Sequence, residues 1–156
     1  MDRVPVLHTE LELEDLVKAF IACTLPREQW THLAHLTVGL WHVDRYDADE
    51  ALARLRVGIR RLNDSHGTVN SDTGGYHETI TRAYVVLLAE FNEWHREGKS
   101  LAERAARLLG SPLAAKEALL TFYLRQTLVS TEARIRWVTP DLTPLQLAHL
   151  DRHETA

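Results

Sequence analysis

The chain has 156 residues, of which 45% are hydrophobic and 26% are charged, as in one globular domain with a sizeable core. The net charge of -4 gives no reason to expect nucleic acid or an anionic membrane as a partner. The single cysteine, Cys23, excludes an internal disulfide framework. No uncharged run could span a bilayer, and the N-terminal Met1 to Pro5 lacks a signal-peptide core, so we expect a cytoplasmic protein.

The first two thirds of the sequence predict four long helices. Thr9 and Glu12 have the spacing of a capping box before an apolar helical pattern, and Pro26 suits the first turn of the next helix. Asp47 is a suitable N-cap for a third helix, and the turn-rich run that ends in Gly74-Gly75 precedes a fourth. The four predicted helices cover about residues 10–23, 30–46, 48–63 and 76–96.

The C-terminal third predicts shorter helices. Ser100 and Glu103 form another capping box, and the Gly110-Ser111-Pro112 run ends that helix and begins the next. Further helical segments are predicted at residues 113–125, 130–137 and 145–150, followed by a frayed tail at 151–156. We therefore predict an all-α fold for residues 1–156, a single-domain helical bundle built on four long helices with shorter C-terminal helices.

Residues 30–43 contain no Asp, Glu, Lys or Arg, and apolar side chains fall on nearly every side of this predicted helix. Such a helix belongs in the middle of a bundle. It nevertheless carries His32 and His35, one turn apart on one side, and His42 seven residues further on, with Gly39 between them. Buried polar groups need hydrogen-bond partners. The function of this protein therefore depends on which groups bind these imidazoles.

A metal ion is one answer. His32 and His35 could supply two ligands for a divalent transition metal (Zn, Fe, Ni or Mn), and His77, at the start of the fourth helix, could supply the third. Glu78 could then act as general base on a metal-bound water or as a further ligand. These residues predict a small metal-dependent enzyme that acts on a small polar molecule.

Several neighbouring residues are candidates for binding the substrate. The Gly74-Gly75 turn leaves backbone N–H groups free at a helix N-terminus, where an anion could dock among nearby hydroxyl groups. Alternatively, the glycines only form a tight turn. Trp41 suits a core position or a pocket wall equally well. The substrate-binding candidates are Trp41, His42, Tyr76, Thr79 and Thr81.

The two motifs Thr31-His32-Leu33-Ala34-His35-Leu36-Thr37-Val38 and Tyr76-His77-Glu78-Thr79-Ile80-Thr81 carry a resemblance. The chain resembles a set of short, uncharacterised bacterial helical proteins that combine H-x-x-H-L-x-V with Y-H-x-T-x-T. The resemblance implies that the histidines, Tyr76, Thr79 and Thr81 belong to one motif, and it implies no particular reaction. At the level of the fold, the chain is also similar to DinB-like three-histidine metalloenzymes, although their ligand spacing is absent.

Three functions remain open from the sequence. The first is the metal-dependent enzyme. The second is a metal-free helical module that binds a polar or anionic ligand through the histidines and Tyr76. The third is a structural protein that forms a homodimer or binds another protein, with its histidines bonded within the core. Each predicts a small-molecule or protein partner, and none involves nucleic acid or a membrane.

Overall fold

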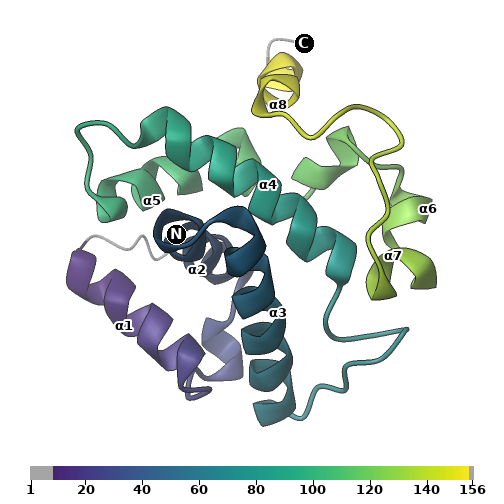
Figure 1. Ribbon diagram of the computed structural model, residues 1–156, viewed down its shortest axis with the longest axis horizontal. Coiled ribbons are helices and arrows are strands. Elements are labelled where there is room, and N and C mark those ends of the chain that lie inside the picture. Colours follow the sequence, from purple (N-terminus) through teal and green to yellow (C-terminus); the bar gives the residue numbers. More distant parts are fainter. Residues whose placement is uncertain (1–8, 155–156) are drawn as a thin grey trace, which may run out of the picture.

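The computed structural model describes residues 9–154, and every regular element in this part of the chain is helical. The predicted all-α fold is confirmed. Four long helices come first. Figure 1 shows α4 crossing the middle of the molecule, with α2 and α3 below it in this view. They are α1 (Glu10–Ile21), α2 (His32–Arg45), α3 (Ala48–Ser65) and α4 (Glu78–His95).

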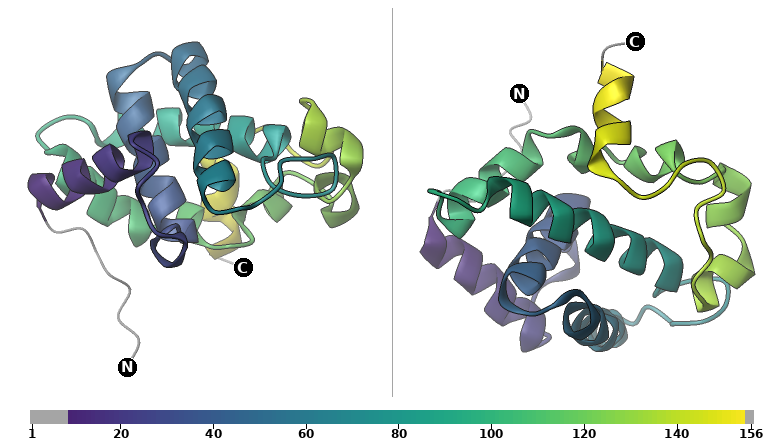
Figure 2. Two further views of the ribbon diagram at one scale, coloured as in Figure 1. Left: turned by 90° about the horizontal axis from the view of Figure 1, so that it is seen from below. Right: turned by 45° about the horizontal axis from the view of Figure 1, so that its top comes forward.

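The remaining elements are short. The C-terminal segment wraps around one end of α4, as both views in Figure 2 show, with α6 and α7 beside the start of that helix. The α-helices of this part are α5 (Leu101–Leu109), α6 (Arg125–Leu128), α7 (Thr131–Ile135) and α8 (Leu147–Glu154). Single 3₁₀ turns lie at Arg27–Gln29, Pro112–Ala114 and Ala118–Thr121.

Side-chain caps account for where helices α1 to α5 begin. At each cap a side-chain oxygen accepts the N–H of the residue three positions later, which satisfies one of the free amides of the first turn. The residues that cap α1, α2, α3 and α5 in this way are Thr9, Thr31, Asp47 and Ser100. In α4 the cap is an imidazole, because Nδ1 of His77 accepts the N–H of Ile80 at 3.1 Å.

α2 is among the most buried helices, as its charge-free sequence predicted. It lies between α1, α3, α4 and α5 and packs most extensively against α4. A Cβ atom built on Gly39 would lie only 2.6 Å from Cδ1 of Leu88, so the glycine leaves room for this side chain of α4.

One predicted helix is wrong. Residues 113–125 form two 3₁₀ turns separated by extended backbone at Ala115, and not a continuous helix. Leu113 and Leu119 are both buried, yet six residues of helix would turn them about 120° apart. The break at Ala115 lets both side chains reach the core, so tertiary packing overrides the local helical pattern.

The last helix is longer than predicted. α8 continues to Glu154, where the sequence predicted fraying from Asp151 onward. Leu147 and Leu150, one turn apart, are each 5% exposed and anchor one side of the helix. Residues 1–8 and 155–156 lie outside the described residues, and they include the N-terminal segment that was expected to lack a signal-peptide core.

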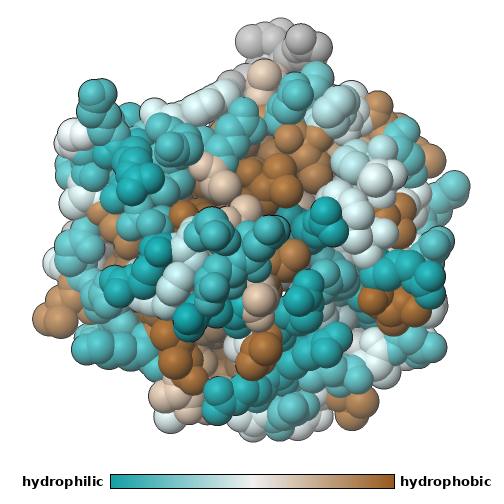
Figure 3. All heavy atoms as spheres, viewed as in Figure 1, coloured by the Kyte–Doolittle hydropathy of each residue, from teal (hydrophilic) through white to brown (hydrophobic). Residues whose placement is uncertain are grey.

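The visible surface is mainly hydrophilic. On the face drawn in Figure 3, hydrophobic side chains form small groups separated by hydrophilic ones. Within residues 9–154, no helix combines the length and the hydrophobicity that crossing a membrane requires.

Thr79 joins the first turn of α4 to the C-terminal segment. Its side chain is fully buried, and its hydroxyl donates to the carbonyl of Arg136 at 2.8 Å while accepting the N–H of Val138 at 3.0 Å. One hydroxyl group therefore satisfies two backbone groups that lie far away in the sequence.

We expect Thr79→Val to lower the free energy of unfolding by about 2–4 kcal/mol, because it leaves both backbone groups without a partner. Thr79→Ser keeps the hydroxyl and should lose only roughly 1 kcal/mol with the methyl group. Urea denaturation of the three proteins measures the difference. Equal losses in both variants would show that the hydroxyl does not stabilise this junction.

Candidate functional site

A pocket of about 330 Å³ lies between α2, α3 and α4. We call it the α2–α4 pocket. Its wall is mainly apolar. Its imidazole and hydroxyl groups come from the start of α2 and from the start of α4. The apolar residues that line it are Leu36, Gly39, Leu55, Ile59, Ile80, Val85 and Leu88, and the aromatic and polar ones are Trp30, His32, His35, Thr81 and Tyr84.

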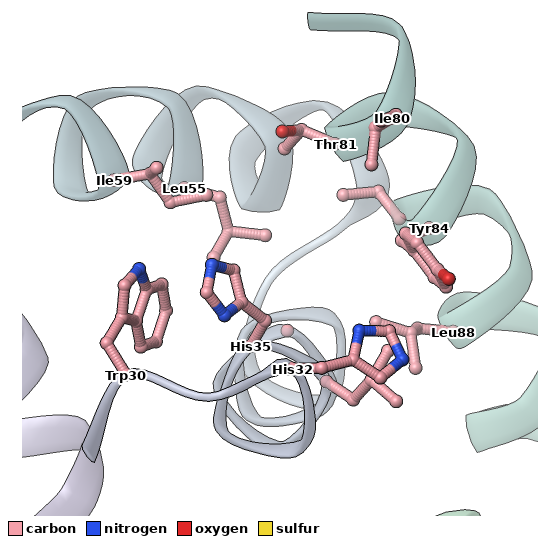
Figure 4. Close-up of a pocket in the computed structure, with 12 residues that line it drawn as sticks. Trp30, His32, His35, Leu55, Ile59, Ile80, Thr81, Tyr84 and Leu88 are labelled. Carbon is pink, nitrogen blue, oxygen red and sulfur yellow. The ribbon is translucent and has the colours of Figure 1, made fainter. Parts of the chain in front are cut away.

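His35 presents a basic nitrogen to this pocket. Its Nδ1 lies 2.7 Å from the carbonyl oxygen of Thr31, and a carbonyl can only accept, so Nδ1 carries the proton. The ring stacks on Trp30 with centroids 3.7 Å apart. Its Nε2 has no hydrogen-bond partner among residues 9–154, and Figure 4 shows this nitrogen turned toward the side chains of α3.

His32 repeats the arrangement one turn earlier. Its Nε2 donates to the carbonyl of Ala114 at 3.1 Å, which leaves Nδ1 as the nitrogen with the lone pair. The edge of the ring faces Tyr84, with centroids 6.2 Å apart. In Figure 4 the two imidazoles rise side by side from the first turn of α2, below the residues contributed by α3 and α4.

Both imidazoles are neutral near pH 7. Burial lowers the pKa of His35 to about 4, against the opposing effect of the Thr31 carbonyl. Burial also lowers the pKa of His32, and the ammonium group of Lys116 adds to that effect. His35 stays accessible to solvent although protein atoms crowd it, because it lines a hollow and not the outer surface.

Two hydroxyl groups complete the polar part of the pocket. Thr81 donates its hydroxyl proton to the carbonyl of His77 at 2.8 Å, so toward the pocket it can only accept. The Tyr84 hydroxyl has no hydrogen-bond partner within residues 9–154, and burial raises its pKa to about 12. The imidazole nitrogens and the Thr81 hydroxyl can thus accept hydrogen bonds from a bound molecule, and the Tyr84 hydroxyl can donate or accept one.

His77 does not share this arrangement. Its Nε2 donates to the carbonyl of Leu128 at 2.7 Å and its Nδ1 accepts from Ile80, so both ring nitrogens are occupied. Burial lowers the pKa of His77 and keeps it neutral. In residues 9–154 no three His, Cys, Asp or Glu side chains are grouped so that they could hold a metal ion. The predicted set of His32, His35 and His77 therefore does not form a three-ligand site here.

Glu78 is also occupied. Its carboxylate accepts two bonds from the guanidinium of Arg56, at 2.9 and 2.7 Å, and one from the Tyr76 hydroxyl at 2.8 Å. The Arg56 guanidinium holds the pKa of Glu78 below its ordinary value, so the carboxylate stays ionised. The cluster ties α3 to α4, and it leaves the carboxylate little capacity to act as a general base.

Of the predicted substrate-binding residues, only Thr81 lines the α2–α4 pocket. Tyr76 lies in the Glu78 cluster and Thr79 bonds the C-terminal segment. Trp41 donates to Glu14 at 3.1 Å, and Nδ1 of His42 donates to the carbonyl of Val38 at 2.7 Å. His42 lies on the same stripe as His35, but two helical turns place it about 10 Å further along α2.

Most of the pocket wall has no distinctive signal in the sequence. Tyr84 falls on the apolar face of the fourth predicted helix, and Leu55 and Ile59 fall on that of the third, so the pattern alone indicates ordinary core positions. The spacing of Thr81, Tyr84 and Leu88 puts them on one side of α4, which could have linked Tyr84 to Thr81. No feature of the sequence indicates that Trp30 lines the pocket, because its stacking on His35 depends on the path of the chain before α2.

No protein-family model matches this sequence, and neither a curated protein nor a solved structure is significantly similar to it. The resemblance to short bacterial helical proteins and to DinB-like metalloenzymes therefore stays a prediction.

The lowered pKa values predict a loss of stability in acid. Neutral His32, His35, His42 and His77 favour the fold fully above the unfolded value of about 6.5, and this contribution is lost as pH falls below it toward the folded values. We expect the melting temperature to fall between pH 7.5 and pH 5, and to fall less in a His35→Gln variant. Parallel profiles for the two proteins would contradict a His35 that the surrounding protein keeps neutral.

Proposed function

We propose that the protein binds a small, largely apolar molecule that carries a hydroxyl or amine hydrogen-bond donor, and that it does so in the α2–α4 pocket without a metal ion. This is the metal-free binding module among the three functions that the sequence left open. The sequence predicted a polar or anionic ligand for this module, and the pocket favours a ligand that also has an apolar body, because most of the pocket wall is apolar.

The observation that carries the proposal is a pair of unpartnered imidazole nitrogens, Nδ1 of His32 and Nε2 of His35, at an apolar cavity. Among the described residues neither nitrogen is a fully buried atom without a partner, so each stays open to the pocket. A bound hydroxyl or amine can donate to such a nitrogen in place of water, and its apolar body would gain from leaving water. Both nitrogens are fixed as acceptors by the carbonyl that each ring bonds on its other side.

The aromatic groups favour a flat ligand. Trp30 backs the His35 ring, and Tyr84 stands beside His32, so planar surfaces border two sides of the pocket. Its volume of about 330 Å³ lies at the lower end of the range for small-molecule sites. A one- or two-ring compound is the size of ligand that such a site accepts.

The test uses 2-naphthol, a flat apolar body with one hydroxyl donor. We expect saturable binding of one molecule per chain by calorimetry. Ile59→Trp should abolish binding by filling the pocket, and His35→Phe should weaken it about fivefold through loss of one hydrogen bond. Val86→Trp, on a face of α4 outside the pocket, is the matched control and should bind normally. No saturable binding, or full binding by Ile59→Trp, would refute the proposal.

A metal-dependent enzyme remains the second candidate, and one observation favours it. His32 and His35 each donate one N–H to a backbone carbonyl, which is how metal-binding histidines are commonly oriented. Only these two imidazoles face the pocket, so most of the coordination shell would have to come from water or substrate.

We therefore expect the purified protein to contain much less than one transition-metal ion per chain by mass spectrometry. A chelator should leave the affinity for 2-naphthol unchanged. One metal ion per chain that is lost in His35→Ala would instead favour the metal-dependent enzyme over the binding module.

A further inference from the structure

A second hollow adjoins the α2–α4 pocket. It has a volume of about 580 Å³ and lies between the start of α4, the 3₁₀ turns and the α6–α7 segment. We call it the cationic cleft because three basic side chains line it. The residues used in the argument below are Lys116, Glu117, Arg125 and Arg134, with His32 and His77 on its wall.

The charges of the cleft are unbalanced. Arg125 lies 3.7 Å from Glu117, and both side chains are well exposed, so water weakens that pair. Arg134 donates to the carbonyl of Gly75 at 2.7 Å and keeps its full charge. Lys116 has no ion-pair or hydrogen-bond partner in the part of the chain that the structure describes. Three cations thus face one carboxylate.

The histidines add no charge to this balance. His77 has both ring nitrogens in hydrogen bonds, and burial lowers its pKa. His32 is also held neutral by burial and by Lys116. The excess positive charge therefore comes from permanent cations, and it persists at neutral pH.

The pocket and the cleft share part of their wall. His32, Ile80 and Tyr84 line both hollows. The two hollows therefore adjoin at the His32 and Tyr84 rings, and a ligand that occupies both would place its apolar body in the α2–α4 pocket and a substituent near Lys116. One end of the combined site is apolar with hydrogen-bond acceptors, and the other end is positively charged.

We infer that the ligand is an amphipathic anion: a flat apolar body with a hydroxyl or amine donor at one end, and a carboxylate at the other that lies in the cationic cleft. This inference rests on the proposed function, since it assigns the class of ligand for the same pocket. The carboxylate is attracted by Lys116 and Arg125, while Arg134 holds the loop that carries Gly75.

The experiment compares 2-naphthol with 6-hydroxy-2-naphthoate, which differs only by a carboxylate at the far end of the same ring system. We expect the hydroxynaphthoate to bind about tenfold more tightly at low salt, because two cations attract it. That advantage should shrink as the salt concentration rises, whereas the affinity for 2-naphthol should stay constant.

The double variant Lys116→Gln/Arg125→Gln should lose the advantage and still bind 2-naphthol as the natural sequence does, which also shows that it is folded. The matched control is Lys99→Gln/Arg107→Gln, which removes the same charge from side chains that line neither hollow. It should keep the advantage, apart from a small effect of net charge.

The outcomes separate the two proposals. If 2-naphthol binds and the carboxylate adds nothing, the anionic ligand class is wrong and the proposed function stands. If the advantage survives in the Lys116/Arg125 double variant, the cationic cleft is not where the carboxylate lies. If neither compound binds, both proposals fall.

Discussion

The close packing of α2 against α4 is the contact on which the rest of the molecule depends. Gly39 presents no side chain at this contact, and a Cβ atom built there would lie 2.6 Å from Cδ1 of Leu88, so a larger residue would force the Leu88 side chain to move. Both residues also line the α2–α4 pocket. The contact that holds the bundle together therefore forms one wall of its candidate site as well.

A second constraint fixes the position of α4. Glu78 bonds Arg56 of α3, and Thr79 bonds the segment after α7. Further along, Arg104 of α5 donates to Asp44 and to Asn92, which joins α2, α4 and α5. Such ties hold polar groups in geometries where nearly every donor and acceptor is satisfied, and this is what keeps α4 at a defined distance from the pocket residues.

These ties also separate structural polar residues from candidate functional ones. His77, Glu78 and Thr79 use their polar atoms within the protein, while His32 and His35 each keep one nitrogen unpartnered at a cavity. A nitrogen that is open to a cavity can accept a hydrogen bond from a ligand, whereas a nitrogen already bonded within the protein cannot. The sequence does not indicate this difference, because both sets of residues lie in short motifs that are rich in polar groups.

Local signals in the sequence were enough to locate the capped helices and the histidine pair. Caps such as Thr9 and Asp47 act within one turn, and the spacing of His32 and His35 puts them on one side of any helix, so neither needs tertiary information. The other features follow from the packing of the folded chain. The partners of His77 and Glu78 are distant in the chain. Packing against the core breaks the helical pattern at Ala115, and Lys116 reaches the site from a separate segment. Contacts over such separations depend on how the helices pack, and local periodicity carries no record of them.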